Sequence, residues 1–288
     1  MTVTYQVTVI FSYIMHVHFL DPYRPTNSLV HQLDGRVKFI LAIAFILTCS
    51  LTPISAWAVY ILLFALILSI EVLSMLGVGY VLKRASMAFP FVLAALPVIF
   101  TTRGVELFSL PIGAWTLIAS VEGLERFISI ALKSWLSVQA AIVMAACTPF
   151  PELLQAMRAV RIPRLLVAMF GLTWRYLFVL VDEALRLMRG RASRSGVNPA
   201  IETGTRSKGR EGGGIIWRAH VVGGMAGSLF LRGFERSDRI YTSMLSRGYD
   251  GEVRLMPLSA LQGGGMFVLV VGLLLLGALL LFGILFWG

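Results

Sequence analysis

The chain has 288 residues and a formal net charge of +10, but only 14% of its residues are charged, against roughly 25% in soluble domains. With 57% hydrophobic residues and a mean hydropathy of +0.81, this composition excludes an ordinary soluble protein and indicates a chain embedded in a bilayer. The basic residues are spread beside apolar spans without interleaved aromatic blocks, so we expect no nucleic-acid partner. Cys49 and Cys147 lie far apart in apolar runs, which indicates neither a disulfide framework nor a thiolate metal site.

Residues 1–36 form an N-terminal segment. Its first part is uncharged and alternates apolar with polar side chains, more like a strand than a helix. A cleaved signal peptide is not expected, because a basic start and a small-residue cleavage site are both missing; a further span here stays open. His16 and His18, with His31, raise the question of a metal site. The His-x-His pair needs a third ligand from elsewhere, so we expect no metal ligand in this chain.

Residues 37–148 are expected to hold the first four transmembrane helices. From Phe39 to Val81 the only charged residue is Glu71, and this run is about twice the roughly 20 residues that one crossing needs. It must therefore fold back once. Pro53 is the natural turn, because proline removes a backbone donor.

The remaining spans follow from the same apolar pattern. A third is expected from about 85 to 102, kinked by Pro90 and Pro97, and a fourth from about 127 to 148. The last lies in residues 263–288, where a long apolar run carries no charge. This makes five spans in all.

The distribution of basic residues predicts the orientation. The arginine-rich residues 149–262 separate the fourth and fifth spans and should be cytoplasmic by the positive-inside rule. The basic pairs at 36–38 and 83–84 then fall on the same side, and residues 103–126 lie outside. We therefore expect an all-α membrane protein with about five transmembrane helices and a cytoplasmic insert of three amphipathic helices.

The three helices of the insert have distinct patterns. The first spans Pro151 to Val160, with prolines at its start and an acid in its first turn. The second begins at Pro163 and continues to Arg194; its first half is apolar nearly all round and would lie in or against the membrane domain. After a Gly-rich, polar loop at 197–214, the third helix is expected from 215 to 247.

The third helix of the insert is amphipathic. Gly223 and Gly227 form a small-xxx-small pair that permits close approach of another helix or marks a kink. From Leu229 onward the apolar side chains cover about half the helix circumference. They are Leu229, Phe230, Phe234, Ile240, Tyr241, Met244 and Leu245.

Both long helices of the insert end in the same short signature. The first is Ser193, Arg194 and Ser195, followed by Gly196, and the second is Ser246, Arg247 and Gly248. A glycine just past a helix is the expected stop. Each arginine would either complement the negative end of its own helix or present a guanidinium beside apolar neighbours to another chain. The repetition of the signature at two helix ends favours the second interpretation.

Three long stretches of this sequence resemble a known family. They are "NSLVHQLDGRVKF", then "TPFPELLQAMRAVRIPRLLVAMFGLTWRYLFVLVDEALRLM", and finally "LFLRGFERSDRIYTSMLSRGYDGE". Over about residues 21–251 the chain is similar to the transmembrane T component of energy-coupling factor (ECF) ABC importers, and within them to the cobalt type, CbiQ. In that family two Ala-Arg-Gly or Ala-Arg-Ser motifs end the coupling helices and dock on two cytosolic ATPase subunits.

The resemblance implies roles for the two signatures. By position it assigns ATPase coupling to Ser193, Arg194 and Ser195 and to Ser246, Arg247 and Gly248, with serine in place of both family alanines. It implies a mechanical subunit that works with two ATP-binding cassette subunits and a CbiM-like membrane subunit, which carries the metal, and with a small accessory membrane subunit in some complexes. No cofactor or catalytic residue is expected, because no Walker A sequence or catalytic triad spacing occurs.

A few polar residues inside apolar segments invite another function. Glu71 is expected to pair with Lys83 or Arg84 or to reach the interface, and Arg175 to brace the insert through Asp182 or Glu183 or to contact a partner. A self-contained permease would need polar residues along several spans. Apart from Glu71 and Lys133 the spans lack them.

Three alternatives stay open from the sequence. The chain could serve a nickel or vitamin importer of the same type, since the substrate subunit decides the cargo. It could be a self-contained permease, or a membrane anchor that recruits a soluble partner.

Overall fold

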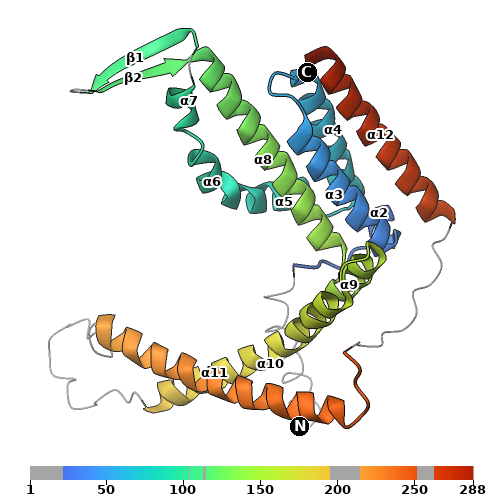
Figure 1. Cartoon of the computed structure of the whole chain (residues 1–288), viewed down its shortest axis with the longest axis vertical. Helices are drawn as coiled ribbons and strands as arrows, with labels where there is room; N and C mark the ends of the chain where they lie inside the picture. The colour runs from blue at the N-terminus through green and yellow to red at the C-terminus, as the bar shows by residue number, and fades with distance from the viewer. Residues whose placement is uncertain (1–21, 103, 113–114, 195–214, 252–262, 288) are drawn as a thin grey trace, which may run out of the picture. The chain divides into compact units, whose positions relative to one another are not determined.

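The computed structural model contains two compact units that are almost entirely helical (Figure 1). The membrane unit comprises residues 1–161 and 257–288, and the insert unit comprises residues 162–256. The expected all-α membrane protein is confirmed, with one short β-hairpin as the departure among the described residues. The residues that the structure describes are 22–102, 104–112, 115–194, 215–251 and 263–287.

The membrane unit is organised around α3, which packs against α8, α9 and α12. Its apolar interior comprises two clusters: one joins α3, α4, α8 and α12, and the other lies where α4, α5 and α8 meet. The principal helices are α2 (Leu29–Gln32), α3 (Gly35–Leu51), α4 (Trp57–Leu73), α8 (Val121–Cys147), α9 (Phe150–Ala159) and α12 (Gly263–Trp287).

The predicted turn at Pro53 is present. α3 ends at Leu51 and α4 begins at Trp57. The Tyr60 hydroxyl donates to the Pro53 carbonyl at 2.7 Å, so the first turn of α4 closes the loop. A proline without a backbone donor and a tyrosine one turn into the next helix together fix this reversal.

The apolar run has a second break that the sequence analysis did not predict. α4 ends at Leu73, and Met75 and Gly77 both have positive φ, 54° and 81°. The Ser74 hydroxyl donates to the Glu71 carbonyl at 2.8 Å and satisfies part of the helix end. The run therefore ends its second crossing earlier than Val81, and the third crossing begins earlier than expected.

The third crossing is a broken helix, as its prolines predicted. It consists of α5 (Val78–Ala85), the 3-10 turn η1 (Ser86–Ala88), α6 (Phe89–Leu93) and α7 (Val98–Thr101). Pro90 lies in the first turn of α6 and Pro97 caps α7. Each proline starts a new helical segment, where its missing N–H costs least.

A hairpin joins the third crossing to α8. Strands β1 (Glu106–Ile112) and β2 (Trp115–Ser120) pair antiparallel, with Ile112 opposite Trp115. Ser120 then caps α8 by accepting from the Gly123 N–H, and its own hydroxyl donates to the Thr102 carbonyl at 2.6 Å. α8 accordingly begins at Val121, earlier than the expected residue 127.

Two lysines, the buried Lys38 and the half-buried Lys133, connect α3 and α8 reciprocally. Lys38, in the first turn of α3, donates to the Cys147 carbonyl at the end of α8 at 2.9 Å. Lys133 of α8 donates to the carbonyls of Ser50 and Thr52 at the end of α3, at 3.1 and 2.6 Å. Each ammonium group meets carbonyls that a helix end leaves unpaired and that carry partial negative charge.

Several of these stretches can cross a membrane. Among the described residues, four helical stretches are long and apolar enough by length and composition, and Trp57–Leu73 is a shorter apolar helix. The four are Val78–Thr101, Val121–Cys147, Arg164–Ser193 and Gly263–Trp287. The third of them belongs to the insert unit, whose first apolar half was expected to lie in or against the membrane domain.

The insert unit consists of two long helices, α10 (Arg164–Arg194) and α11 (Ile215–Leu245), which contact each other. Both match the predicted second and third insert helices closely. The predicted first helix corresponds to α9, which packs against α3 in the membrane unit. Among the described residues of the insert unit, only Val167 and Ala168 are buried apolar side chains.

Candidate functional site

The end of α11 is a Schellman motif centred on the second signature. The Tyr249 N–H donates to the Met244 carbonyl and the Gly248 N–H donates to the Leu245 carbonyl, both at 3.0 Å. Gly248 has a φ of +79°, in the left-handed region that glycine adopts without strain. The predicted glycine stop is therefore present, and it places Arg247 at the C-cap position.

Arg247 is exposed at this helix end. Among the described residues its guanidinium group has no hydrogen bond, ion pair or ring contact, although carbonyls of its own helix end are near in sequence. The interpretation that this arginine only complements its own helix therefore has no contact to support it. The side chain is free to meet another molecule.

The first signature lies at the end of α10. Ser193 is exposed, and its hydroxyl donates back to the Gly190 carbonyl at 3.0 Å. Arg194 is the last residue of the helix. Ser195 and Gly196 lie outside the described residues, so the structure places Ser193 and Arg194 in the last turn of α10 and does not describe the expected glycine stop.

Exposed aromatic residues lie on the same helix as Arg247. Phe230 and Phe234 stack with ring centroids 6.4 Å apart and remain 72% and 58% exposed. Tyr241 and Leu245 are 55% and 49% exposed, so the apolar stripe continues to the helix end. A run of large exposed apolar side chains beside an arginine is typical of a protein contact surface.

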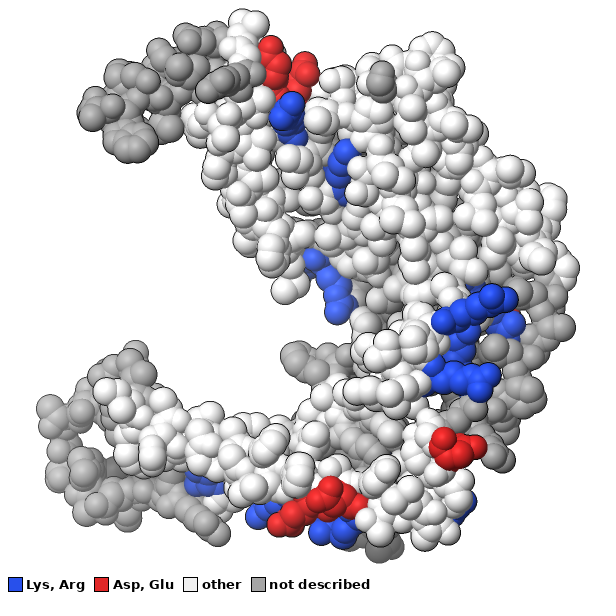
Figure 2. All heavy atoms as spheres, in the orientation of Figure 1, with Lys and Arg blue, Asp and Glu red and all other residues white. Residues whose placement is uncertain are grey.

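An ion pair joins α10 and α11. Glu183 of α10 accepts from Arg232 of α11 at 2.6 Å and lies 3.6 Å from Arg186. A cleft beside this pair is lined by Leu180, Ile240 and Arg236. Figure 2 shows basic and acidic side chains side by side on this unit.

Arg175 takes neither of the expected ionic partners. It lies beside the Tyr176 ring, 6.0 Å from the centroid, and forms no ion pair among the described residues. Glu183 is already engaged by two other arginines. The expected brace through the neighbouring acids is therefore wrong for Glu183, and a contact of Arg175 with a partner stays a prediction.

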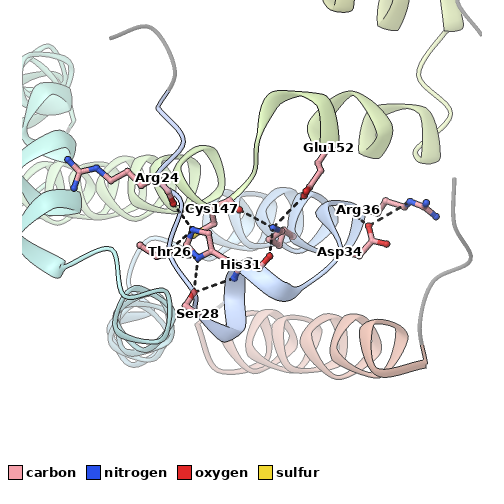
Figure 3. A network of polar contacts seen from close by, with 9 residues as sticks. Arg24, Thr26, Ser28, His31, Asp34, Arg36, Cys147 and Glu152 are labelled. Carbon is pink, nitrogen blue, oxygen red and sulfur yellow. Dashed lines mark hydrogen bonds and ion pairs between the residues drawn. The ribbon is translucent and has the colours of Figure 1, made fainter. Parts of the chain in front are cut away.

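A second polar cluster lies at one end of the membrane unit (Figure 3). At its centre, Lys38 lies 3.8 Å from Glu152 of α9 in addition to its bond to Cys147. Gly35 permits this approach, because a Cβ there would lie 3.0 Å from the Cβ of Glu152. The cluster thus fixes the elbow between α8 and α9 against the start of α3.

His31 belongs to the same cluster. Its ring lies within hydrogen-bond distance of the hydroxyls of Thr26 and Ser28 and of the Arg24 carbonyl. Burial lowers the pKa of His31 below its ordinary value, and the charge of Lys38 acts in the same direction. The imidazole is therefore a neutral structural group near pH 7.

The structure gives no support to a metal site at His31. Among the described residues there is no group of three or more His, Cys, Asp or Glu side chains that could hold a metal ion. His16 and His18 lie outside the described residues. The sequence analysis missed His31 and Lys38 as structural residues, although both lie in the stretch "NSLVHQLDGRVKF" that carries the family resemblance.

Glu71 does not form the ion pair or reach the interface that the sequence predicted. It is fully buried in α4, and neither carboxyl oxygen has a hydrogen-bond partner in the described part of the chain. The expected pairing with Lys83 or Arg84 is absent. The reason is that Glu71 follows Leu63 and Ile67 on the face of α4 that forms the core with α8, and so points inward.

These observations define a multi-pass helical membrane protein with a separate unit of two long helices that end in arginine signatures. A family model described as "Cobalt transport protein", CbiQ, matches residues 26–258. The chain belongs to this family and is a T component of the energy-coupling factor type.

Individual relatives agree with this assignment. The energy-coupling factor transporter transmembrane protein EcfT of Ruminiclostridium cellulolyticum is 26% identical over 264 residues, which cover 88% of this chain and 92% of the relative. The cobalt transport protein CbiQ of Rhodobacter capsulatus is 25% identical over 221 residues, 77% of this chain and 82% of the relative. CbiQ of Salmonella typhimurium is 30% identical over 123 residues, 43% and 48% of the two chains. The protein is thus a transport component of the cell membrane.

Proposed function

We propose that this chain is the coupling subunit of an ECF-type ABC importer for cobalt ions. Two cytosolic ATPase subunits engage the ends of α10 and α11 through Arg194 and Arg247, and a CbiM-like membrane subunit binds the metal. The insert unit lies in the cytoplasm. ATP hydrolysis takes place in the partner subunits, and this chain carries their movement to the substrate subunit.

The observation that carries this proposal is the state of Arg247. Its helix end is closed by the Schellman motif without help from the guanidinium, and the side chain has no partner among the described residues. A planar guanidinium with five donors binds carboxylates and carbonyls with defined geometry. A rigid helix that ends in such a group can transmit a displacement of its partner.

Cobalt as the cargo rests on the family and on two relatives. The matching model and the proteins of Rhodobacter capsulatus and Salmonella typhimurium are described as cobalt transport proteins. The relative from Ruminiclostridium cellulolyticum bears only the general name of a transporter component. The CbiQ type therefore favours cobalt over nickel or a vitamin.

The test is co-purification of the complex in mild detergent, together with cobalt uptake by cells. The Arg194→Ala plus Arg247→Ala variant should still insert in the membrane but lose the ATPase subunits and cobalt uptake. Arg247→Lys keeps the charge and loses the planar fork, so it should retain only part of the coupling.

The matched control removes the same charge from the same helices. Arg189 and Arg236 are exposed and have no partner among the described residues, so Arg189→Ala plus Arg236→Ala should leave co-purification and uptake unchanged. The proposal fails if the ATPase subunits co-purify fully with the Arg194 and Arg247 double variant, or if both double variants lose them equally.

A further inference from the structure

Three exposed basic side chains of the membrane unit have no acidic partner in the part of the chain that the structure describes. Arg24 belongs to the segment before α2, and Lys83 and Arg84 belong to the last turn of α5. All three are exposed, and no ion pair joins any of them to a carboxylate among the described residues. Exposed cations without a counter-charge among the described residues can bind an anionic partner.

Tyr80 holds two of these cations in place. The guanidinium carbon of Arg24 lies 3.7 Å from the centroid of the Tyr80 ring. The guanidinium of Arg84 lies 5.9 Å from the same centroid and donates to the Tyr80 hydroxyl at 2.6 Å. One aromatic side chain therefore brings two like charges together, by a cation–π contact and a hydrogen bond.

The backbone of Arg24 is fixed as well. Its N–H donates to the Ala146 carbonyl at 3.0 Å, and its carbonyl lies 3.0 Å from the His31 ring nitrogen. From this anchored position the side chain extends away from the polar cluster (Figure 3). Since both guanidinium groups are positioned before any ligand arrives, binding an anion requires little further ordering.

Exposed apolar side chains precede and follow α5 along the chain. Met75 is 70% exposed before the helix, and Met87 and Phe91 are 76% and 80% exposed after it. α5 itself buries Val81 and Ala85 and turns its basic residues outward. Basic groups on a helix that exposed apolar residues precede and follow in sequence match a phospholipid, whose anionic headgroup joins directly to acyl chains.

We propose that Arg24 and Arg84, held by Tyr80, bind the phosphate of an anionic phospholipid. Each guanidinium can donate two parallel hydrogen bonds to phosphate oxygens. The acyl chains lie along the exposed apolar residues beside α5. The residues of this site belong to the membrane unit, and the proposal does not depend on which metal is transported.

A topological role of the basic residues alone does not account for this arrangement. The positive-inside rule depends on the number of Lys and Arg in a loop, and it needs neither an aromatic ring under Arg24 nor a hydroxyl acceptor for Arg84. Free phosphate shares the headgroup chemistry but makes no use of the apolar surroundings. These differences decide the design of the test.

The test measures lipid binding to the purified chain in a neutral detergent by native mass spectrometry. Phosphatidylglycerol and phosphatidylcholine with the same acyl chains are titrated separately, and inorganic phosphate is added as a competitor. We expect preferential binding of phosphatidylglycerol that inorganic phosphate does not displace. Arg24→Gln plus Arg84→Gln should weaken this binding by about fivefold for each arginine removed.

Two further variants separate the site from general charge. Tyr80→Phe keeps the ring beneath Arg24 and removes the acceptor of Arg84, so it should cause an intermediate loss even if the double variant folds poorly. Arg126→Gln removes an exposed arginine near the start of α8 and should leave the preference unchanged.

The proposal is overturned if the unaltered chain shows no preference for phosphatidylglycerol, or if Tyr80→Phe and the double variant both retain it. Displacement by inorganic phosphate alone would assign the site to a free anion. A double variant that keeps its lipid preference but loses a partner subunit would assign the two arginines to a protein contact instead.

Discussion

The two units of this protein use their polar side chains in opposite ways. In the membrane unit several of them join segments distant in sequence, as the buried Lys38 does with Cys147 and the half-buried Lys133 with Thr52. In the insert unit the polar contacts are exposed, and most are local to one helix. Figure 2 shows the visible face of the membrane unit with few charges over most of its area.

The two units also differ in how many of their apolar side chains are buried. Among the described residues, the membrane unit holds nearly all of the buried apolar side chains, and in the insert unit only Val167 and Ala168 are buried. Its aromatic residues Phe230 and Phe234 remain exposed. The membrane unit therefore has its own packed interior, whereas the exposed apolar residues of the insert unit are typical of a contact surface.

Lys38→Met is expected to have the largest effect on the stability of the membrane unit. It removes the cap of the Cys147 carbonyl and the contact with Glu152, and should lower the free energy of unfolding by about 2–3 kcal/mol. Denaturation by SDS in mixed micelles measures this loss. Lys83→Met is the control, because Lys83 is exposed; an equal loss in both variants would contradict the role of Lys38.

Alanine in place of glycine should have opposite effects in the two units. At Gly123 a Cβ would lie 2.5 Å from the Ile99 carbonyl oxygen, whereas at Gly227 it meets nothing within 4 Å. We expect Gly123→Ala to cost about 1–3 kcal/mol and Gly227→Ala to stabilise its helix by about 0.5–1 kcal/mol. Thermal unfolding of both variants in detergent gives the answer, and a shared sign would break the comparison.

A smaller effect is expected from pH. Because the folded pKa of His31 is lowered, its ring takes up a proton more readily in the unfolded chain, whose pKa is about 6.5. Stability should therefore fall as the pH decreases below about 6.5, down to the folded pKa, and should not depend on His31 above that range. His31→Gln should remove this part of the pH profile, measured as unfolding temperature against pH; an unchanged profile would count against it.

The smallest effect is expected at the crossing of α10 and α11. Arg232 is 58% exposed in its pair with Glu183, so Arg232→Gln should cost less than about 1 kcal/mol and less still at high salt. A double-mutant cycle with Glu183→Gln measures the pair directly. A coupling of several kcal/mol would show that this unit is held together as firmly as the membrane unit.

Local pattern was sufficient to predict the features that depend on neighbouring residues. The turn at Pro53, the breaks near Pro90 and Pro97 and the glycine stop after Arg247 all follow from the chemistry of one or two residues. The two long helices of the insert follow from periodicity over many turns. These features were predicted with little error.

The features that were missed depend on partners elsewhere in the chain. Nothing close to Lys38 in sequence indicates that it caps a helix 109 residues away. The hairpin from Glu106 to Ser120 lies between two spans, in residues that were expected only to form an external loop. Glu71 resembles an interfacial acid until the packing of α4 on α8 shows that it faces inward.

The reciprocal lysine caps have a consequence for biogenesis. The Thr52 carbonyl at the end of α3 accepts a hydrogen bond from Lys133, which is synthesised 81 residues later. The Cys147 carbonyl at the end of α8 accepts from Lys38, which is synthesised 109 residues earlier. A nascent chain with only its early spans would lack the lysine that caps the end of α3, and the carbonyls there would be without this donor. We therefore expect fragments that stop short of α8 to fold less stably than the whole chain.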